Sequence, residues 1–232
     1  SLAPLILGTF KVTIIAMIFS VPLSLAAAIY TSEFAPKWAR ESLKPAVEML
    51  AGFPSVVLGF FALMVLASWT QDWFGFDYRL NALVAGLALS LAVIPIIYTV
   101  CEDAFSAVPR TIKEASLALG ASRSQTALRV VLPAATPGVF AAIVLGFGRA
   151  IGETMIVLMA SGNAAITSWS FTDSTRTLAT TIAAEMAEVV VGSPHYRVLF
   201  FIGLLLFVIT FALNSIGSWV IWSLRQKLSG RS

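Results

Sequence analysis

Two charged residues stand four positions apart in the otherwise apolar stretch Gly146-Phe-Gly-Arg149-Ala-Ile-Gly-Glu153-Thr154-Met155. On a helix they share one face, and placing both in hydrocarbon costs about 5–7 kcal/mol before any pairing. A guanidinium is a permanently charged fork of donors that suits an oxyanion. We therefore expect Arg149, Glu153 and Thr154 to line a water-filled substrate pathway, with Glu153 positioning the arginine near the middle of its helix. The alternative is a structural pair that bridges two helices.

The composition predicts a membrane protein. The 232 residues are 58% hydrophobic and only 12% charged, about half the charged fraction of a soluble domain. The one cysteine, Cys101, lies in an apolar stretch and predicts a small core residue, with no disulfide framework and no metal site. The sequence contains neither a phosphate-binding Gly-x-x-x-x-Gly-Lys-Ser/Thr motif nor a cluster of residues suited to catalysis. We therefore expect a transport subunit without enzyme chemistry or a cofactor of its own.

Hydropathy predicts an all-α membrane bundle that forms one transmembrane domain over residues 1–232. A helix needs roughly 20 apolar residues to cross the bilayer. Because the sequence opens at Ser1 without a methionine, we expect a fragment that lacks an upstream helix. The five segments long enough to cross are Leu5–Ile29, Ala46–Trp69, Ala82–Cys101, Pro137–Met159 and Val198–Trp222.

Basic residues predict the orientation of these helices. One set of alternate loops carries ten lysines and arginines, and the other set carries three. The positive-inside rule places the rich loops and the C-terminus in the cytoplasm. Lys11, near the outer end of the first helix, is expected to snorkel and to have no transport role. The rich set is Lys37, Arg40, Lys44, Arg110, Lys113, Arg123, Arg129, Arg225, Lys227 and Arg231, and the poor set is Arg79, Arg176 and Arg197.

Two loops are too long to be simple connectors. The inner loop, about residues 102–133, has capping-box patterns at Thr111–Glu114 and Ser122–Gln125 with Gly120 between them. We expect two short cytoplasmic helices hinged at this glycine. The outer loop, about residues 160–197, contains good helix formers from Arg176 to Val190, which predict a short helix there.

The inner loop resembles the EAA loop of bacterial ABC importer permeases. In that pattern Glu-Ala-Ala is followed by Gly and then by an aliphatic-x-Leu-Pro, and Ser116 replaces the third residue of the triplet. The resemblance implies a type I (MetI-like) permease bundle whose coupling helix docks into an ATP-binding subunit. The residues that it assigns to coupling are Glu114, Ala115, Ser116, Gly120, Leu132 and Pro133.

Residues 148–155, Gly162-Asn163, Leu50–Phe61 and Arg176-Thr-Leu are similar to the C-type permease of the bacterial high-affinity phosphate importer. The resemblance implies phosphate import across the inner membrane, with a second, A-type permease and an extracytoplasmic phosphate-binding protein. It also implies two ATP-binding subunits that hold ATP and Mg²⁺.

Other readings stay open. An importer of the same build could carry sulfate or molybdate, although a site for fully deprotonated sulfate gains little from a nearby carboxylate. A channel or membrane enzyme without an ATPase partner would need no EAA-like loop.

Overall fold

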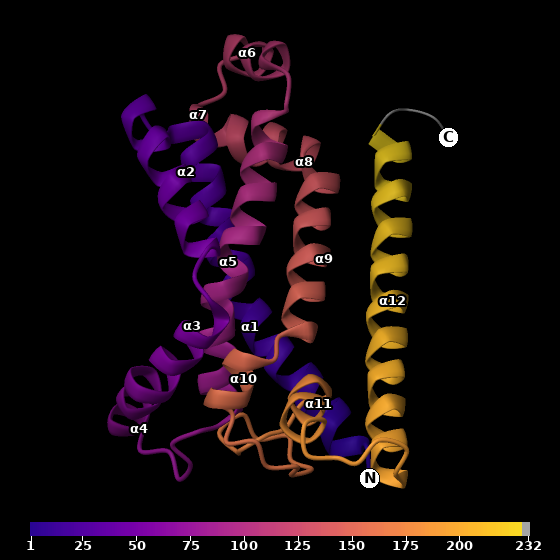
Figure 1. The fold of residues 1–232 in the computed structure, drawn as a ribbon. Coiled ribbons are helices and arrows are strands. Elements are labelled where there is room, and N and C mark those ends of the chain that lie inside the picture. The colour runs from indigo at the N-terminus through magenta and orange to yellow at the C-terminus, as the bar shows by residue number, and fades with distance from the viewer. Residues whose placement is uncertain (229–232) are drawn as a thin grey trace. The chain divides into compact units, whose positions relative to one another are not determined.

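The computed structural model describes residues 1–228 and is helical, with one isolated bridge between Gly162 and Thr175 among these residues (Figure 1). The all-α expectation is confirmed. Of the basic residues expected in the C-terminal tail, Arg231 lies outside the described residues. The helical elements are α1 (Ala3–Ile29), η1 (Tyr30–Phe34), α2 (Lys37–Ala51), α3 (Ser55–Phe61), η2 (Ala62–Leu66), α4 (Ala67–Phe74), α5 (Ala82–Ser106), α6 (Arg110–Ala118), α7 (Arg123–Thr126), η3 (Ala127–Val131), α8 (Leu132–Ala134), α9 (Thr136–Gly152), α10 (Met155–Ala160), α11 (Leu178–Glu185) and α12 (Pro194–Leu228).

Four stretches of the described chain are long and apolar enough to cross a membrane, and a bent pair could supply a fifth. The bent pair is Arg123–Ala134 with Thr136–Gly152, and its halves meet at 69°. The expectation of five crossings is therefore met only when this pair counts as one span. The four stretches are Ala3–Phe34, Ser55–Phe74, Ala82–Ser106 and Pro194–Leu224.

The second crossing begins later than the expected Ala46. The amphipathic helix α2 ends at Ala51, and the spanning stretch starts at Ser55. Pro54 is the reason, because a proline disfavours helical backbone in the residue before it and fits best at a helix start. The backbone of Pro54 is extended, and α3 begins at the next residue.

The fourth crossing is broken where a continuous helix was expected. Helix α9 ends at Gly152, and the chain continues as α10 from Met155. Arg149 therefore lies in the last turn of α9 and not near the middle of a helix. Glycine is a poor helix former, and the Glu153 carboxylate accepts the Thr154 N–H at 3.2 Å in place of a helical carbonyl.

The chain forms two compact units. The first comprises Ser1–Phe19, Phe53–Val93 and Phe147–Ala212. Within it α10 packs on α3, and a Cβ added at Gly59 would lie 3.1 Å from the Met155 carbonyl oxygen. Leu5, Leu178, Leu199 and Ile202 form an apolar core between α1, α11 and α12 (Figure 1).

The second unit comprises Ser20–Gly52, Ile94–Gly146 and the chain from Leu213 onward. It contains η1, α2, the end of α5 and the short helices α6 to α8 (Figure 1). A Cβ at Gly138 would lie 2.4 Å from the Ala104 Cβ, so α9 and α5 approach closely there. Cys101 is fully buried, as expected of a small core residue.

Candidate functional site

The candidate substrate site is the break between α9 and α10. An Arg149 guanidinium nitrogen lies 3.6 Å from a Glu153 carboxylate oxygen, which is an ion pair but too long for a hydrogen bond. The Arg149 side chain is 51% exposed, whereas that of Glu153 is 6% exposed. The carboxylate is therefore enclosed by protein, and the guanidinium keeps donors free. The pair joins the last turn of α9 to the break and does not bridge two separate helices.

Open space adjoins this arginine. A Cβ built on Gly152 meets no atom within 4 Å, and Gly152 itself is exposed. Thr154 is half-buried, and its hydroxyl donates to the Gly152 carbonyl at 3.3 Å. The structure thus brings Arg149, Glu153 and Thr154 together at the end of α9, beside an exposed glycine.

The inner loop contains the two short helices that were expected. Helix α6 ends in a Schellman motif, in which the Ala121 N–H donates to the Ser116 carbonyl and the Gly120 N–H donates to the Leu117 carbonyl. Gly120 has φ +84°, a conformation that favours glycine. The Ser122–Gln125 capping box that starts α7 is confirmed. The Thr111–Glu114 box is wrong, because α6 already begins at Arg110 after Pro109 and has no side-chain cap.

The residues expected to couple the chain to an ATPase lie on α6, at the turn after it and at the start of α8. Ser116 replaces the usual alanine, and its hydroxyl lies 3.0 Å from that of Thr126, which ties α6 to α7. Ile112 on α6 is 45% exposed and Leu119 at its C-cap is 90% exposed, so this part of the loop presents apolar side chains to its surroundings. Glu114, Ala115, Gly120 and Pro133 are exposed, and Ser116 and Leu132 are half-buried.

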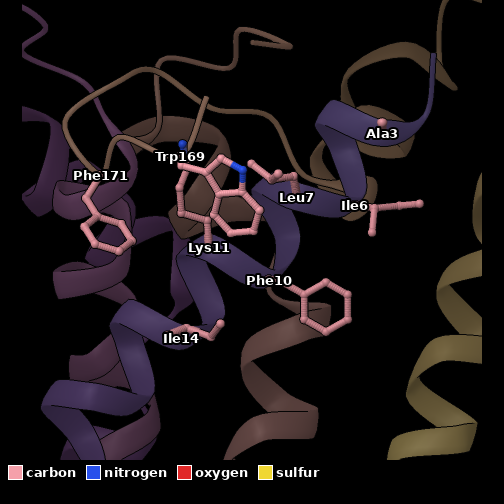
Figure 2. A pocket seen from close by; sticks show the side chains of 8 residues that line it. All are labelled: Ala3, Ile6, Leu7, Phe10, Lys11, Ile14, Trp169 and Phe171. Atoms are coloured by element: carbon pink, nitrogen blue, oxygen red, sulfur yellow. The ribbon is translucent and has the colours of Figure 1, made fainter. Parts of the chain in front are cut away.

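The snorkelling expected of Lys11 is wrong. Its residue is 3% exposed, and the ammonium donates to the carbonyls of Ser168 at 3.1 Å and Ser170 at 2.9 Å. The stem of Lys11 helps to line an otherwise apolar cavity of 490 Å³ on α1, beneath Trp169 and Phe171 (Figure 2). The outer loop, not the solvent, satisfies this charge.

The outer loop contains the short helix that was expected. Thr177 caps α11 by accepting from the Thr180 N–H. Arg176 donates to Asn163 Oδ1 at 3.0 Å and to Glu185 Oε1 at 2.6 Å. His195, to which no role was assigned, lies 2.9 Å from the other Glu185 oxygen. These bonds join the loop after α10 to α11 and to the start of α12.

Sequence reasoning missed the bonds that join α2 to the membrane helix α5. Lys44 donates to Glu102 at 2.8 Å and to Asp103 at 2.9 Å. These hydrogen bonds raise the pKa of Lys44 above its ordinary 10.5. Because the pKa is higher in the folded than in the unfolded chain, the protonated lysine stabilises the fold fully at any pH below the unfolded-state pKa. This stabilisation is lost as the pH rises through the folded-state pKa. The bridge therefore persists at neutral pH. The partners are 58 residues apart, so no local spacing signals them.

The chain belongs to the family described as the binding-protein-dependent transport system inner membrane component, whose model matches residues 20–229. It is therefore an ABC transporter permease, a transport subunit of the inner membrane.

Individual relatives are similar over most of the chain. The probable ABC transporter permease protein YqgH of Bacillus subtilis is 38% identical over 208 residues, which cover 90% of this chain and 67% of that protein. The phosphate transport system permease protein PstC of Pasteurella multocida is 34% identical over 241 residues, which cover 96% and 75%. PstC 1 of Mycobacterium tuberculosis is 36% identical and covers 91% and 69%.

Solved structures share the fold. An inward-facing MetNI methionine ABC transporter chain superposes with a TM-score of 0.73 at 18% identity and covers 94% of this chain and 93% of that one. A chain of a bacterial ABC transporter that imports the acidic polysaccharide alginate gives 0.69 at 13% identity, covering 95% and 78%. These likenesses confirm the expected MetI-like permease bundle.

Proposed function

We propose that this chain carries inorganic phosphate inward across the cytoplasmic membrane. The observation that carries the proposal is the break after α9, where a half-exposed Arg149 adjoins a buried Glu153 and open space at Gly152. A forked cation binds a tetrahedral oxyanion through paired, charge-assisted hydrogen bonds. The names of the PstC relatives support phosphate as that anion.

Glu153 supports phosphate over sulfate. Hydrogen phosphate still carries a proton that a nearby carboxylate can accept, whereas sulfate has none to offer. The carboxylate also holds the guanidinium in position while the site is empty. In this proposal Thr154 completes the pathway beside the break.

The transport energy comes from partner subunits. We propose that the chain pairs with a second, A-type permease, two ATP-binding subunits and an extracytoplasmic phosphate-binding protein. ATP and Mg²⁺ are held by the ATP-binding subunits. The exposed apolar side chains of Ile112 on α6 and of Leu119 at its C-cap support docking of the inner loop into such a subunit. The distribution of basic residues supports a cytoplasmic C-terminus.

Uptake by the assembled importer in proteoliposomes tests the proposal. We expect labelled phosphate to accumulate only with ATP, and excess sulfate to leave this uptake unchanged. Arg149→Gln removes the charged fork while keeping a polar side chain, so uptake falls to background although the ATP-binding subunit still co-purifies. Arg79→Gln, which removes an arginine outside the break, serves as the matched control. Normal phosphate uptake by stably inserted Arg149→Gln, or full inhibition by sulfate, contradicts the assignment.

A further inference from the structure

Backbone carbonyls at the ends of two membrane helices accept hydrogen bonds from charged side chains. The carbonyl of Phe105, near the end of α5, cannot pair with residue 109, which is proline, and it accepts the Val108 N–H at 3.3 Å instead. The carbonyl of Ser32 lies in η1, a π-helix that ends two residues later at Phe34. Carbonyls at helix ends must find other donors. In the second unit, lysine and arginine side chains provide further donors.

One lysine serves both helix ends. The Lys113 ammonium, on α6, donates to the Phe105 carbonyl at 3.2 Å and to Glu33 Oε1 at 2.6 Å. Glu33 belongs to η1, and the same oxygen accepts the Ser32 hydroxyl at 2.9 Å. The Lys113 and Glu33 side chains are only 19% and 14% exposed, so water screens the pair weakly.

Helix α2 is held to the same two ends by other residues. The Arg40 guanidinium donates to the carbonyls of Thr31, at 3.0 Å, and Ser32 in η1. Lys44 binds Glu102 and Asp103 in the last turns of α5. The ends of α1 and α5 are thus joined twice, once through α2 and once through α6.

Helix α6 has little other anchorage. None of its nine described residues is buried, so apolar packing does not hold it to the membrane helices. Its neighbours are α7 and η3, and Ser116 reaches Thr126 on α7. Figure 1 shows α6 beyond the end of α5. A displacement of α6 therefore reaches the membrane helices through Lys113, through the Ser116–Thr126 contact with α7, or along the chain itself.

The geometry points to Lys113 and Glu33 as a positioning pair that transmits movement of α6 to the ends of α1 and α5 during transport. The inference rests on the proposed docking of the inner loop to an ATP-binding subunit. The pair touches neither substrate nor nucleotide. Its loss uncouples ATP hydrolysis from uptake and leaves docking intact.

The test measures phosphate taken up per ATP hydrolysed by the full-length importer in proteoliposomes. Lys113→Met keeps an unbranched stem without the charge, and Glu33→Gln removes the charge on the other side. We expect each to lower the coupling ratio about tenfold, a size typical of residues that couple distant sites. ATP hydrolysis and co-purification of the ATP-binding subunit stay near wild type. Lys37→Met, at an exposed lysine of α2, is the matched control and keeps the full ratio.

Further variants separate transmission from folding. Lys113→Arg keeps a positively charged donor for both Glu33 and the Phe105 carbonyl, so we expect it to keep most of the coupling. The exchange Lys113→Glu with Glu33→Lys restores the ion pair but not the bond to Phe105, so it couples better than either single reversal. An unchanged ratio in Lys113→Met and Glu33→Gln overturns the inference, as does loss of the ATP-binding subunit from the purified complex. If the wild-type importer takes up another anion, only the proposal that phosphate is the substrate fails. The coupling ratio of the variants is then measured as uptake of that anion per ATP hydrolysed.

Discussion

The buried carboxylate of Glu153 is the residue that gives the broken helix its chemical character. An isolated charge is costly to bury, and this one is offset by the Thr154 N–H and the Arg149 guanidinium. The arginine, half exposed, retains donors for a ligand. A buried carboxylate beside an exposed guanidinium is the arrangement expected when Glu153 positions Arg149 for an incoming anion.

Gly8 is a second residue whose identity the packing dictates. A Cβ there would lie 2.2 Å from the Arg176 carbonyl oxygen and 2.6 Å from Thr175 Oγ1. We predict that Gly8→Ala destabilises the protein by about 1–3 kcal/mol, because backbone in the outer loop has to move. Thermal unfolding in detergent measures the loss.

Gly203→Ala is the matched control for Gly8→Ala. It also adds one methyl group to a membrane helix, but its nearest neighbour is Ile182 Cδ1 at 3.8 Å, an ordinary contact. We expect a change within about 0.5 kcal/mol. Equal stability of the two variants contradicts the close approach at Gly8.

At the scale of elements, the short helices α6 and α7 depend on their ends. The Ser122 hydroxyl accepts from the Gln125 N–H, and the Gln125 side chain accepts from the Ser122 N–H. We predict that Ser122→Ala destabilises α7 by about 1 kcal/mol, the usual loss for an N-cap. Faster amide exchange over residues 123–126 in hydrogen-exchange mass spectrometry reports the effect.

Thr111→Ala provides the comparison for this prediction. Thr111 belongs to an equivalent sequence pattern but does not cap α6, because that helix already begins at Arg110. We expect unchanged exchange over residues 112–118. Faster exchange there, equal to that in Ser122→Ala, would mean that the threonine caps α6 after all.

At the scale of the whole molecule, the distribution of basic residues predicts which loops face the cytoplasm. We predict that a cysteine at Ser124, in the inner loop, reacts with an impermeant maleimide only after cells are permeabilised. A cysteine at Val191, which is 78% exposed in the outer loop, reacts in intact cells. Both are placed in a Cys101→Ala background, which removes the one native thiol of the chain.

The reverse labelling pattern would place the inner loop outside and remove the basis for its coupling to an ATP-binding subunit. Labelling of the Cys101→Ala background itself measures the non-specific signal.

The sequence by itself determined the class of protein, most of the membrane helices and the hinge at Gly120. These features depend on local signals: apolar stretches of sufficient length, a glycine at a helix end and the Ser122–Gln125 pattern. It also singled out Arg149 and Glu153, because charge within an apolar stretch is visible without a structure.

Only the tertiary structure decided where the fourth crossing breaks, how Lys11 is satisfied and what holds α6. The break depends on a carboxylate that competes with a helical carbonyl, which helix propensity does not describe. Lys11 finds carbonyls more than 150 residues away, and Lys113 finds Glu33 80 residues away. Such partners are set by the folding of distant segments onto one another, because a buried charge must be paired wherever a partner lies.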